Sequence, residues 1–325
     1  MIRKITTRLL ALFVLGSNAF ALAAFAQAYP SKAIRMIVPY AAGGPTDVLA
    51  RVMAQKLGEA VSQSVFVENK PGANGISGTD AIAKAVPDGY TIGLSTIGPL
   101  AVNPSLIANI PYDSLKDFAP ILLLARSYSM LAVHPSVPAN NMRELVALAK
   151  ANPGKYSYAT GGVGTTQHLS GELLSNVAGI KMLHVPYKGE GAAQSDLLGG
   201  QVHMMFTSTI IANTHVKAGK LRAIAVASAQ RLPSIPDVPT IAETYPGFEV
   251  TAWFGMVAPA GTPDAVVKRL NDAFQTVLKN PEIVKKLEDL GALPAGGPPS
   301  ELTALLRSEL PKWRDVIRKA DIKAE

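Results

Sequence analysis

The sequence predicts an α/β fold in which mainly parallel sheets carry helices on both faces. Two observations lead to this prediction. Apolar strand-like segments alternate with helix-like segments from Tyr29 onward, which is typical of parallel sheets covered by helices. In addition, several strands are each followed by a short turn rich in Gly, Ser or Thr and then by a helix start. These turns are Ala41–Asp47, Ser95–Pro99, Gly161–Thr166, Tyr187–Gly191 and the shorter Thr207–Ser208.

The first of these units is the most informative segment of the chain. The β-branched run Ile34–Val38 predicts a buried strand, and Ala41–Gly44 predicts a turn. Pro45 suits the first position of a helix that we expect over Thr46–Val61. A helix start has unpaired N–H donors and a partial positive charge, so this turn could hold an anion. Any strand-to-helix turn of an α/β protein has the same features, and that alternative stays open here.

The remaining elements follow in chain order. The first series continues with a strand Val65–Glu68, a glycine-rich loop Asn69–Gly75, a helix to Ala85, a strand Tyr90–Ser95, a proline-rich connection Asn103–Pro120 and a strand Ile121–Ala125. The second series contains strands at Met130–His134, Tyr156–Ala159, Met182–Pro186, Val202–Phe206 and Leu221–Ala227, with helices at Met142–Ala151, Gln167–Ala178, Ala192–Leu198 and Thr209–Ala218. A strand Val250–Ala258 and helices near Pro263–Leu278, Pro281–Leu290 and Ser300–Ala320 complete the chain.

The order of these elements favours two lobes joined by two hinge crossings. The C-terminal helices follow too few strands to form a domain alone, so we expect them to return to the first sheet. The chain would then cross near Ala125–Ser129 and again near Val250–Phe254. The predicted lobes are residues 29–126 with 253–325, and residues 127–252. Two crossings permit hinge closure over a ligand, although a single large sheet would fit the same segments.

Residues 1–28 have the features of a secretory signal peptide, with cleavage expected after Ala28. Three basic residues precede the apolar stretch Leu9–Ala26, and small residues flank Gln27. The alternative is an uncleaved membrane anchor, but Gly16–Asn18 interrupts the apolar stretch. The chain contains no cysteine, so it has no disulfide framework, thiolate nucleophile or lipid-carrying cysteine. An exported chain of this kind suits the bacterial periplasm.

Composition limits the classes of ligand. The formal net charge is +7 at pH 7 and falls to about +4 without the three basic residues of the leader. No cluster of Lys and Arg with interleaved aromatic residues indicates nucleic-acid binding. The five histidines show no metal-ligand spacing. We therefore expect no nucleic-acid partner, no metal and no cofactor.

Several polar and aromatic residues near the predicted turns also fit ordinary structural roles. Asp47 suits a helix cap, with Arg51 as its partner or as a surface residue, and His168 suits a structural role. Tyr40 and Tyr187 each end a strand beside a glycine turn, so either could face a cleft. Sequence motifs of serine hydrolases, P-loop proteins, zinc proteases and dinucleotide-binding proteins are absent. An exported hydrolase or isomerase that uses Asp47 and His168 across the cleft is the enzyme alternative.

The chain also resembles the Bug family, the extracytoplasmic solute receptors of tripartite tricarboxylate transporters. The resemblance extends from Tyr29 to the C-terminal helices, and its motifs occur in the family order. They are Pro39–Asp47, Glu68–Ala73, Pro87–Tyr90, Gly164–Leu169, His184–Gly189, Gly219–Ala223, Pro236–Thr240 and Ala258–Pro263.

The resemblance implies a two-lobed, type II periplasmic-binding-protein fold and a non-enzymatic, monomeric receptor. It implies capture of a small mono- or dicarboxylate and delivery to membrane permease subunits of the transporter. One ligand carboxylate would lie at the turn Tyr40–Asp47, partly through ordered water, and the second lobe would contact the rest of the ligand. The residues that match the family's binding positions are Tyr40, Ala42, Gly43, Gly44, Thr46, Asp47, Thr96, Ile97, Gly164, Thr165, Thr166, Tyr187 and Thr207.

One position departs from the family pattern. Members commonly have Asp where this chain has Thr207. A carboxylate there would repel a second ligand carboxylate and could hold an ammonium group, whereas threonine does neither. Thr207 therefore predicts a ligand without an amino group, such as an aliphatic or aromatic mono- or dicarboxylate. A receptor that presents its closed form to a sensor protein, in place of a permease, is the second alternative function.

Overall fold

The computed structural model describes residues 29–43, 45–187, 189–289, 291–320 and 322–323. The predicted leader with its cleavage site after Ala28, and the predicted site residue Gly44, lie outside the described residues.

The described elements match the predicted order closely. The first part contains β1 (Ile34–Val38), α2 (Pro45–Val61), β2 (Val65–Asn69), η1 (Ala73–Gly75), α3 (Ile76–Ala83), β3 (Thr91–Thr96), η2 (Gly98–Val102) and α4 (Asn103–Leu106). The middle part contains β4 (Phe118–Val133), α5 (Met142–Ala151), β5 (Ser157–Thr160), α6 (Thr166–Ala178), β6 (Leu183–Pro186), α7 (Glu190–Leu198), β7 (Met204–Ser208), α8 (Thr209–Lys217) and β8 (Arg222–Val226). The last part contains η3 (Ile241–Glu243), β9 (Thr251–Pro259), α9 (Asp264–Leu278), α10 (Pro281–Asp289), β10 (Ala292–Gly296) and α11 (Pro299–Lys319).

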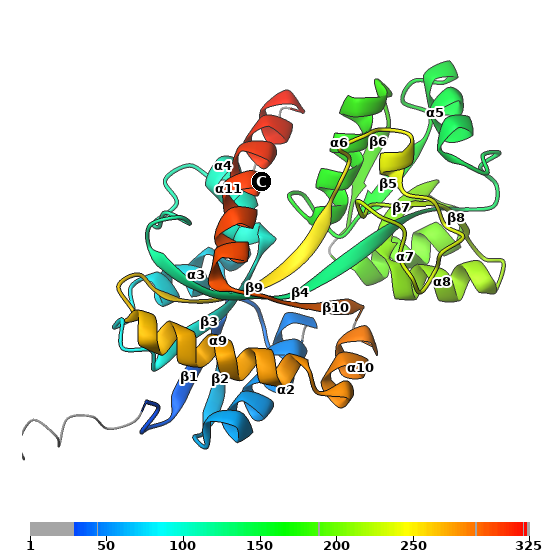
Figure 1. Cartoon of the computed structure of the whole chain (residues 1–325). Helices are drawn as coiled ribbons and strands as arrows, with labels where there is room; N and C mark the ends of the chain where they lie inside the picture. The colour runs from blue at the N-terminus through cyan, green and yellow to red at the C-terminus, as the bar shows by residue number, and fades with distance from the viewer. Residues whose placement is uncertain (1–28, 44, 188, 290, 321, 324–325) are drawn as a thin grey trace, which may run out of the picture.

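Two long strands join the two lobes (Figure 1). In β4, residues Phe118–Tyr128 pair with β9, while Ser129–Val133 pair with β7 in the other lobe. The strands follow the order β2-β1-β3-β9-β4-β7-β5-β6, and both β8 and β10 pair with β4. We call the lobe of β1–β3 lobe 1 and the lobe of β5–β8 lobe 2. Ser127 and Tyr128 of β4 face Ala252 and Thr251 of β9 in the register. Both strands cross between the lobes here, at the predicted hinge, and we call these residues with Ser129 the hinge segment. The exact lobe boundaries remain a prediction.

The sheets are mixed, whereas mainly parallel sheets were expected. The outer pairs β1–β2, β1–β3, β5–β6 and β5–β7 are parallel. All pairs that involve β4 or β9 are antiparallel. The physical reason is that strand direction depends on how the chain returns between lobes, and periodicity within a strand does not record it.

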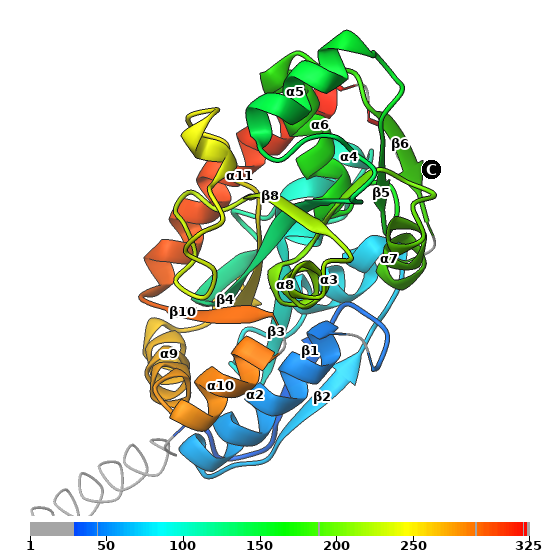
Figure 2. The ribbon, with the colours of Figure 1, turned by 90° about the vertical axis from the view of Figure 1, so that its right-hand side faces the viewer.

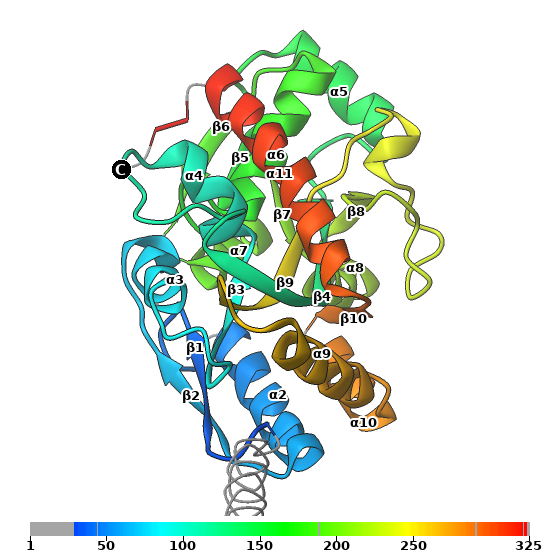
Figure 3. The same cartoon turned by 60° about the vertical axis from the view of Figure 1, so that its left-hand side comes forward.

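Helices cover both faces of each sheet, as predicted. Apolar side chains of α2, α9 and α10 form one core with β1 and β3, including Leu49, Phe274 and Leu287. On the opposite face α11 packs along β4, with Leu302 and Trp313 fully buried, and Figure 3 shows α11 on this side. In Figure 2, α5 of lobe 2 lies at one end of the molecule and α2, α9 and α10 at the other.

Three details of the prediction were wrong. β10 was missed, because its sequence ALPAG contains proline and glycine and carries no strand pattern. The short helix α4 lies inside the segment expected to be an irregular connection. Thr207 and Ser208 belong to β7, where they pair with Met130 and Ser129, and do not form a separate turn. Among the described residues, no helix is both long enough and apolar enough to cross a membrane.

Candidate functional site

A cavity of about 320 Å³ lies in lobe 2 against the hinge strands. Four of its lining residues belong to the hinge segment, namely Ser127, Tyr128, Ser129 and Ala252. The others are the last three residues of β7 and residues that follow β5 and β6, namely Phe206, Thr207, Ser208, Gly161, Thr165, Thr166, Gln167 and Glu190. The cavity therefore lies where ligands bind in open α/β sheets, beyond the carboxyl ends of the strands.

The two glycine-containing loops of lobe 2 touch each other at this cavity. The Gly189 N–H donates to the Gly161 carbonyl at 3.1 Å, and the Tyr187 N–H donates to the Thr160 carbonyl at 2.9 Å. A Cβ on Gly161 would lie 3.1 Å from the Glu190 backbone nitrogen. Glycine at position 161 therefore allows the second loop to approach closely and to bring the start of α7 to the cavity wall.

The start of α6 lies at the wall of this cavity. Thr165 is the N-cap residue, and its Oγ1 accepts the His168 N–H at 3.4 Å while its hydroxyl donates to the Gly162 carbonyl at 2.7 Å. These bonds fix the loop so that Thr165 and Thr166 line the cavity. The N-terminal end of a helix carries a partial positive charge, which stabilises a bound anion.

One charged side chain faces the cavity among the described lining residues, the carboxylate of Glu190. The Thr207 hydroxyl lies 3.1 Å from Glu190 Oε1 and 3.1 Å from Gln194 Oε1. Sequence reasoning did not find Glu190, because an acidic residue in the first turn of a helix is ordinarily a response to the helix dipole. The closeness of α7 to β7 is what places it beside Thr207.

In lobe 1 the predicted turns also meet. The hydroxyl groups of Tyr40 and Thr96 lie 2.7 Å apart, so the turn after β1 contacts the end of β3. Tyr40 is half-buried and burial raises its pKa, which keeps the phenol protonated at neutral pH. A Cβ on Gly75 would lie 2.7 Å from Pro99 and 3.5 Å from the Tyr40 ring. Glycine therefore permits η1 to close over this pair of turns.

The buried carboxylate of Asp47 holds the turn between β1 and α2 in place. Its carboxylate accepts hydrogen bonds from the Gly43 N–H at 2.8 Å, Arg51 Nε at 3.0 Å and Asn69 Nδ2 at 2.9 Å. The Arg51 hydrogen bond, followed by that from Gly43, lowers the pKa of Asp47 to about 2. Asp47 is 2% exposed, so it orders the turn around Gly43, as its interpretation as a cap and Arg51 partner predicted.

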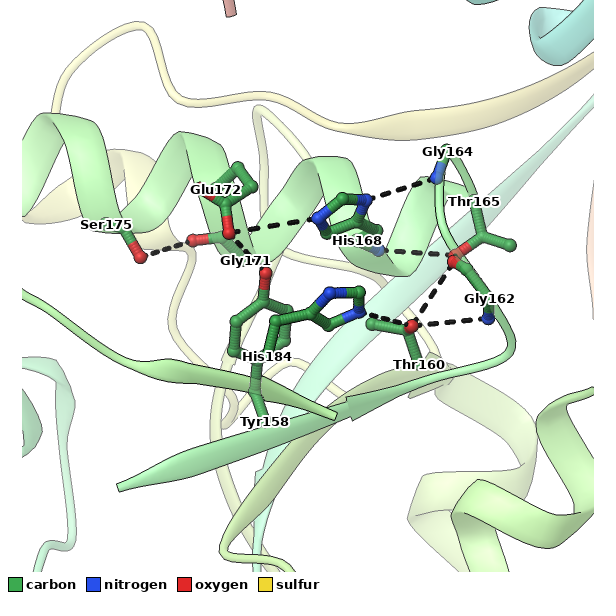
Figure 4. Close-up of polar contacts among 10 residues, drawn as sticks. All are labelled: Tyr158, Thr160, Gly162, Gly164, Thr165, His168, Gly171, Glu172, Ser175 and His184. Atoms are coloured by element: carbon green, nitrogen blue, oxygen red, sulfur yellow. Dashed lines mark hydrogen bonds and ion pairs between the residues drawn. The ribbon is translucent and has the colours of Figure 1, made fainter. Parts of the chain in front are cut away.

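Two histidines stack behind the cavity loop (Figure 4). The ring centroids of His168 and His184 lie 4.0 Å apart with the planes 9° from parallel, and Tyr158 stacks on the other side of His184. His168 Nδ1 accepts the Gly164 N–H at 3.1 Å, and His184 Nε2 lies 2.7 Å from the Thr160 hydroxyl. Burial, together with the neighbouring His184, lowers the pKa of His168 to about 4. Both rings therefore support the loop as neutral imidazoles at pH 7.

The predicted site residues fall into three groups. Thr165, Thr166 and Thr207 line the lobe 2 cavity, with Gly164 next to them in the loop. The lobe 1 group surrounds the two turns that meet at Tyr40, namely Tyr40, Ala42, Gly43, Thr46, Asp47, Thr96 and Ile97, and none of these lines the lobe 2 cavity. Tyr187 is half-buried, and its hydroxyl donates to Asp196 at 2.6 Å. Among the described residues, no group of three or more His, Cys, Asp or Glu could hold a metal ion.

Comparison with known proteins gives the family. A profile of the family described as tripartite tricarboxylate transporter family receptor matches residues 49–322. The chain is 41% identical over 292 residues to the UPF0065 protein of the tcbD-tcbE intergenic region in Pseudomonas sp. strain P51, covering 89% of this chain and 87% of that protein. It is 37% identical over 321 residues to protein BugT of Bordetella pertussis, covering 98% of each chain.

Solved structures agree with this assignment. The periplasmic binding protein BugD matches with a TM-score of 0.74 and 39% identity, over 91% of this chain and all of that one. Rhodopseudomonas palustris Rpa4515, solved with adipate, matches with a TM-score of 0.77 and 34% identity, over 91% and 99% of the two chains. MatC from the same organism, solved with malate, matches with a TM-score of 0.73 and 32% identity, over 89% of this chain and all of that one. The chain therefore belongs to the tripartite tricarboxylate transporter receptor family and is a periplasmic solute-binding receptor of the Bug type.

Proposed function

We propose that this receptor captures a small carboxylate between its two lobes and delivers it to the membrane permease of a tripartite tricarboxylate transporter. The observation that carries the proposal is the lobe 2 cavity, where the start of α6 and the hydroxyls of Thr165 and Thr166 lie against the hinge. Relatives solved with adipate and malate support a carboxylate ligand.

The free energies of contacts with helix starts and hydrogen-bond donors are sufficient to bind a carboxylate without an arginine side chain. A helix N-terminus stabilises an anion by about 0.3–1 kcal/mol, and by ~2 kcal/mol where it is partly buried. A hydrogen bond to a charged group contributes about 1.5–3 kcal/mol. A micromolar complex requires roughly 8 kcal/mol. Two helix starts with four or five such bonds reach this value even after the cost of association.

The second helix start would come from lobe 1. The turn Tyr40–Asp47 runs into the first turn of α2 and is ordered by Asp47 and Asn69. This order holds the helix start in a fixed position, where its partial positive charge favours an anion. We propose that bending of β4 and β9 at Ser127–Ser129 and Thr251–Ala252 closes this turn, with Thr96 and Ile97, over the cavity. The binding residues proposed from the sequence, including Gly44 and Tyr187, remain part of this proposal. So do the lobe boundaries, a monomeric state, cleavage after Ala28 and the absence of an enzymatic activity.

Calorimetric titration of the mature protein with mono- and dicarboxylates of four to eight carbons tests the proposal. We expect one-to-one binding of at least one carboxylate, with no binding of a neutral sugar of similar size. A parallel thermal-shift screen identifies the ligand, because a ligand at 100 times its Kd stabilises the fold by about 2.7 kcal/mol. If no carboxylate binds, the proposal is wrong.

Delivery and the alternatives need separate measurements. Uptake of the labelled ligand by cells should require both the receptor and the permease. Recovery of the ligand unchanged after prolonged incubation separates a receptor from an exported hydrolase or isomerase. Normal uptake without the receptor, accompanied by loss of a transcriptional response to the ligand, would favour the sensor-coupled alternative.

A further inference from the structure

The charge inside the lobe 2 cavity is the starting point. The described lining residues supply hydroxyl, amide and apolar groups. Among them, Glu190 is the one acidic residue, and none of them is Lys, Arg or His. A cavity for a carboxylate therefore has a carboxylate of its own in its wall. Two ligand carboxylates cannot both approach this wall without one of them meeting the negative charge.

The position of the Glu190 carboxylate is set by a short polar chain. The Thr207 hydroxyl has one proton and cannot donate to both Glu190 and Gln194, although it lies 3.1 Å from an oxygen of each. The Gln194 Nε2 atom is buried and has no hydrogen-bond partner in the part of the chain that the structure describes. Rotation of the Gln194 amide by 180° places that NH₂ group against Thr207 and leaves the Thr207 proton for Glu190. Thr207 and Gln194 are 1% and 9% exposed, so this chain is a built part of the wall.

A second polar group at the same wall lacks a partner. The Ser129 hydroxyl is buried and has no hydrogen-bond partner among the described residues. Ser129 lines the cavity and pairs with Ser208, next to Thr207. Glu190 and Ser129 line the same cavity as the start of α6. The wall therefore offers acceptors to one part of a ligand and donors to another part.

From this arrangement we infer that Glu190 selects carboxylates that carry a hydrogen-bond donor, an ammonium or hydroxyl group, close to the carboxylate. The inference rests on the proposed function. The ligand carboxylate binds at Thr165 and Thr166, and its donor group faces Glu190 and Ser129. The loops that carry these groups are hydrogen-bonded to each other at Gly161 and Gly189, so one small head group reaches both.

This inference replaces the ligand expected from Thr207. The argument from Thr207 assumed that the wall has no carboxylate when threonine follows β7. The structure shows a carboxylate oxygen 3.1 Å from the Thr207 hydroxyl, supplied by α7. An amino group is therefore matched at this wall, and an unsubstituted dicarboxylate meets repulsion there.

Pairs of ligands that differ in one group test the inference by calorimetry on the mature protein. The pairs are aspartate with succinate, glutamate with glutarate, and 2-aminoadipate with adipate, with malate as the hydroxyl analogue of succinate. We expect the amino member of the best-binding pair to bind about tenfold to a hundredfold more tightly, the effect of one hydrogen bond to a charged group. Malate should lie between aspartate and succinate.

Variants assign the preference to the side chain. Glu190→Gln should bring the ratio of the two Kd values within each pair to near one, because the amino ligand binds more weakly and the unsubstituted ligand binds more tightly. Glu190→Asp should keep the preference for the amino ligand. Glu282→Gln, an exposed residue of α10, is the matched control and should leave the ratios unchanged.

The outcomes separate this inference from the proposed function. Equal binding of both members by the wild type, or an unchanged ratio in Glu190→Gln, overturns the role of Glu190 and leaves a carboxylate receptor. If no member of any pair binds the wild type and the wider carboxylate panel also fails, both proposals are wrong.

Discussion

The imidazole rings of His168 and His184 stack 4.0 Å apart directly behind the loop that lines the lobe 2 cavity. His168 belongs to α6 and His184 to β6, and each contacts the loop or the strand residue before it, through Gly164 and Thr160. Burial lowers the pKa of both histidines, so two uncharged rings support the loop at the cavity at neutral pH.

Acidification should weaken the fold through His168. Burial lowers the pKa of His168 from 6.5 to about 4, so between these pH values the unfolded chain binds a proton that the folded chain excludes. The free energy of unfolding therefore falls as the pH falls from 6.5 to 4, by up to about 3 kcal/mol.

Urea unfolding at several pH values checks this prediction. His168→Asn keeps an acceptor near the Gly164 N–H and should show a shallower dependence on pH between 6.5 and 4 than the wild type. The same substitution at His215, half-buried on α8, is the control and should keep the wild-type slope. An equal slope in His168→Asn and wild type would contradict the prediction.

Asp47→Asn should destabilise lobe 1. The buried carboxylate accepts three hydrogen bonds, including one from Arg51, and loss of its charge should lower the free energy of unfolding by about 1–3 kcal/mol. Because the pKa of Asp47 is about 2, its contribution is complete above pH 3.8 and is lost as the pH falls toward 2. Asp272→Asn removes an exposed pair with Lys268 and should change stability by less than about 0.5 kcal/mol. Similar losses in both variants would refute the role of Asp47.

Gly171→Ala should be destabilising although alanine favours helices. A Cβ at this position of α6 would lie 2.3 Å from the ring of Tyr158, which is fully buried and stacked on His184. Overpacking of this kind costs about 1–3 kcal/mol, more than the ~1 kcal/mol gained in helix propensity. At Gly191 of α7 a Cβ would have no neighbour within 4 Å among the described residues, so Gly191→Ala should stabilise by up to about 1 kcal/mol. Thermal unfolding of the two variants should give shifts of opposite sign.

Thr165→Val should reduce both stability and ligand affinity. The hydroxyl that caps α6 and donates to Gly162 is lost while the side-chain shape is kept, which should cost about 1 kcal/mol of stability. If the start of α6 binds the ligand carboxylate, affinity should also fall about tenfold or more, because loss of the cap and of the bond to Gly162 loosens the loop that positions the N–H groups of the helix start. Thr165→Ser keeps the hydroxyl and should retain both properties. An affinity unchanged in Thr165→Val would remove this residue from the proposed site.

Part of the candidate site was predicted from the sequence. Thr165, Thr166 and Thr207 were predicted from strand ends and motif positions, and they line one cavity. Glu190, Ser129 and Phe206 line the same cavity, but each has a residue type and position that also fits an ordinary helix or strand. No local pattern distinguishes them, because their role comes from the approach of α7 and β4 to β7.

The sequence by itself determined the elements whose signals are local. β1 and α5 have the predicted residues, Ile34–Val38 and Met142–Ala151, because β-branched runs and N-cap residues act over a few neighbouring positions. Only the tertiary structure decided the antiparallel course of β4 and β9, the strand β10, the His168–His184 stack and the place of Glu190 beside Thr207. Each of these joins residues far apart in the chain or on different elements, and such contacts are fixed by packing, which local backbone preference does not encode.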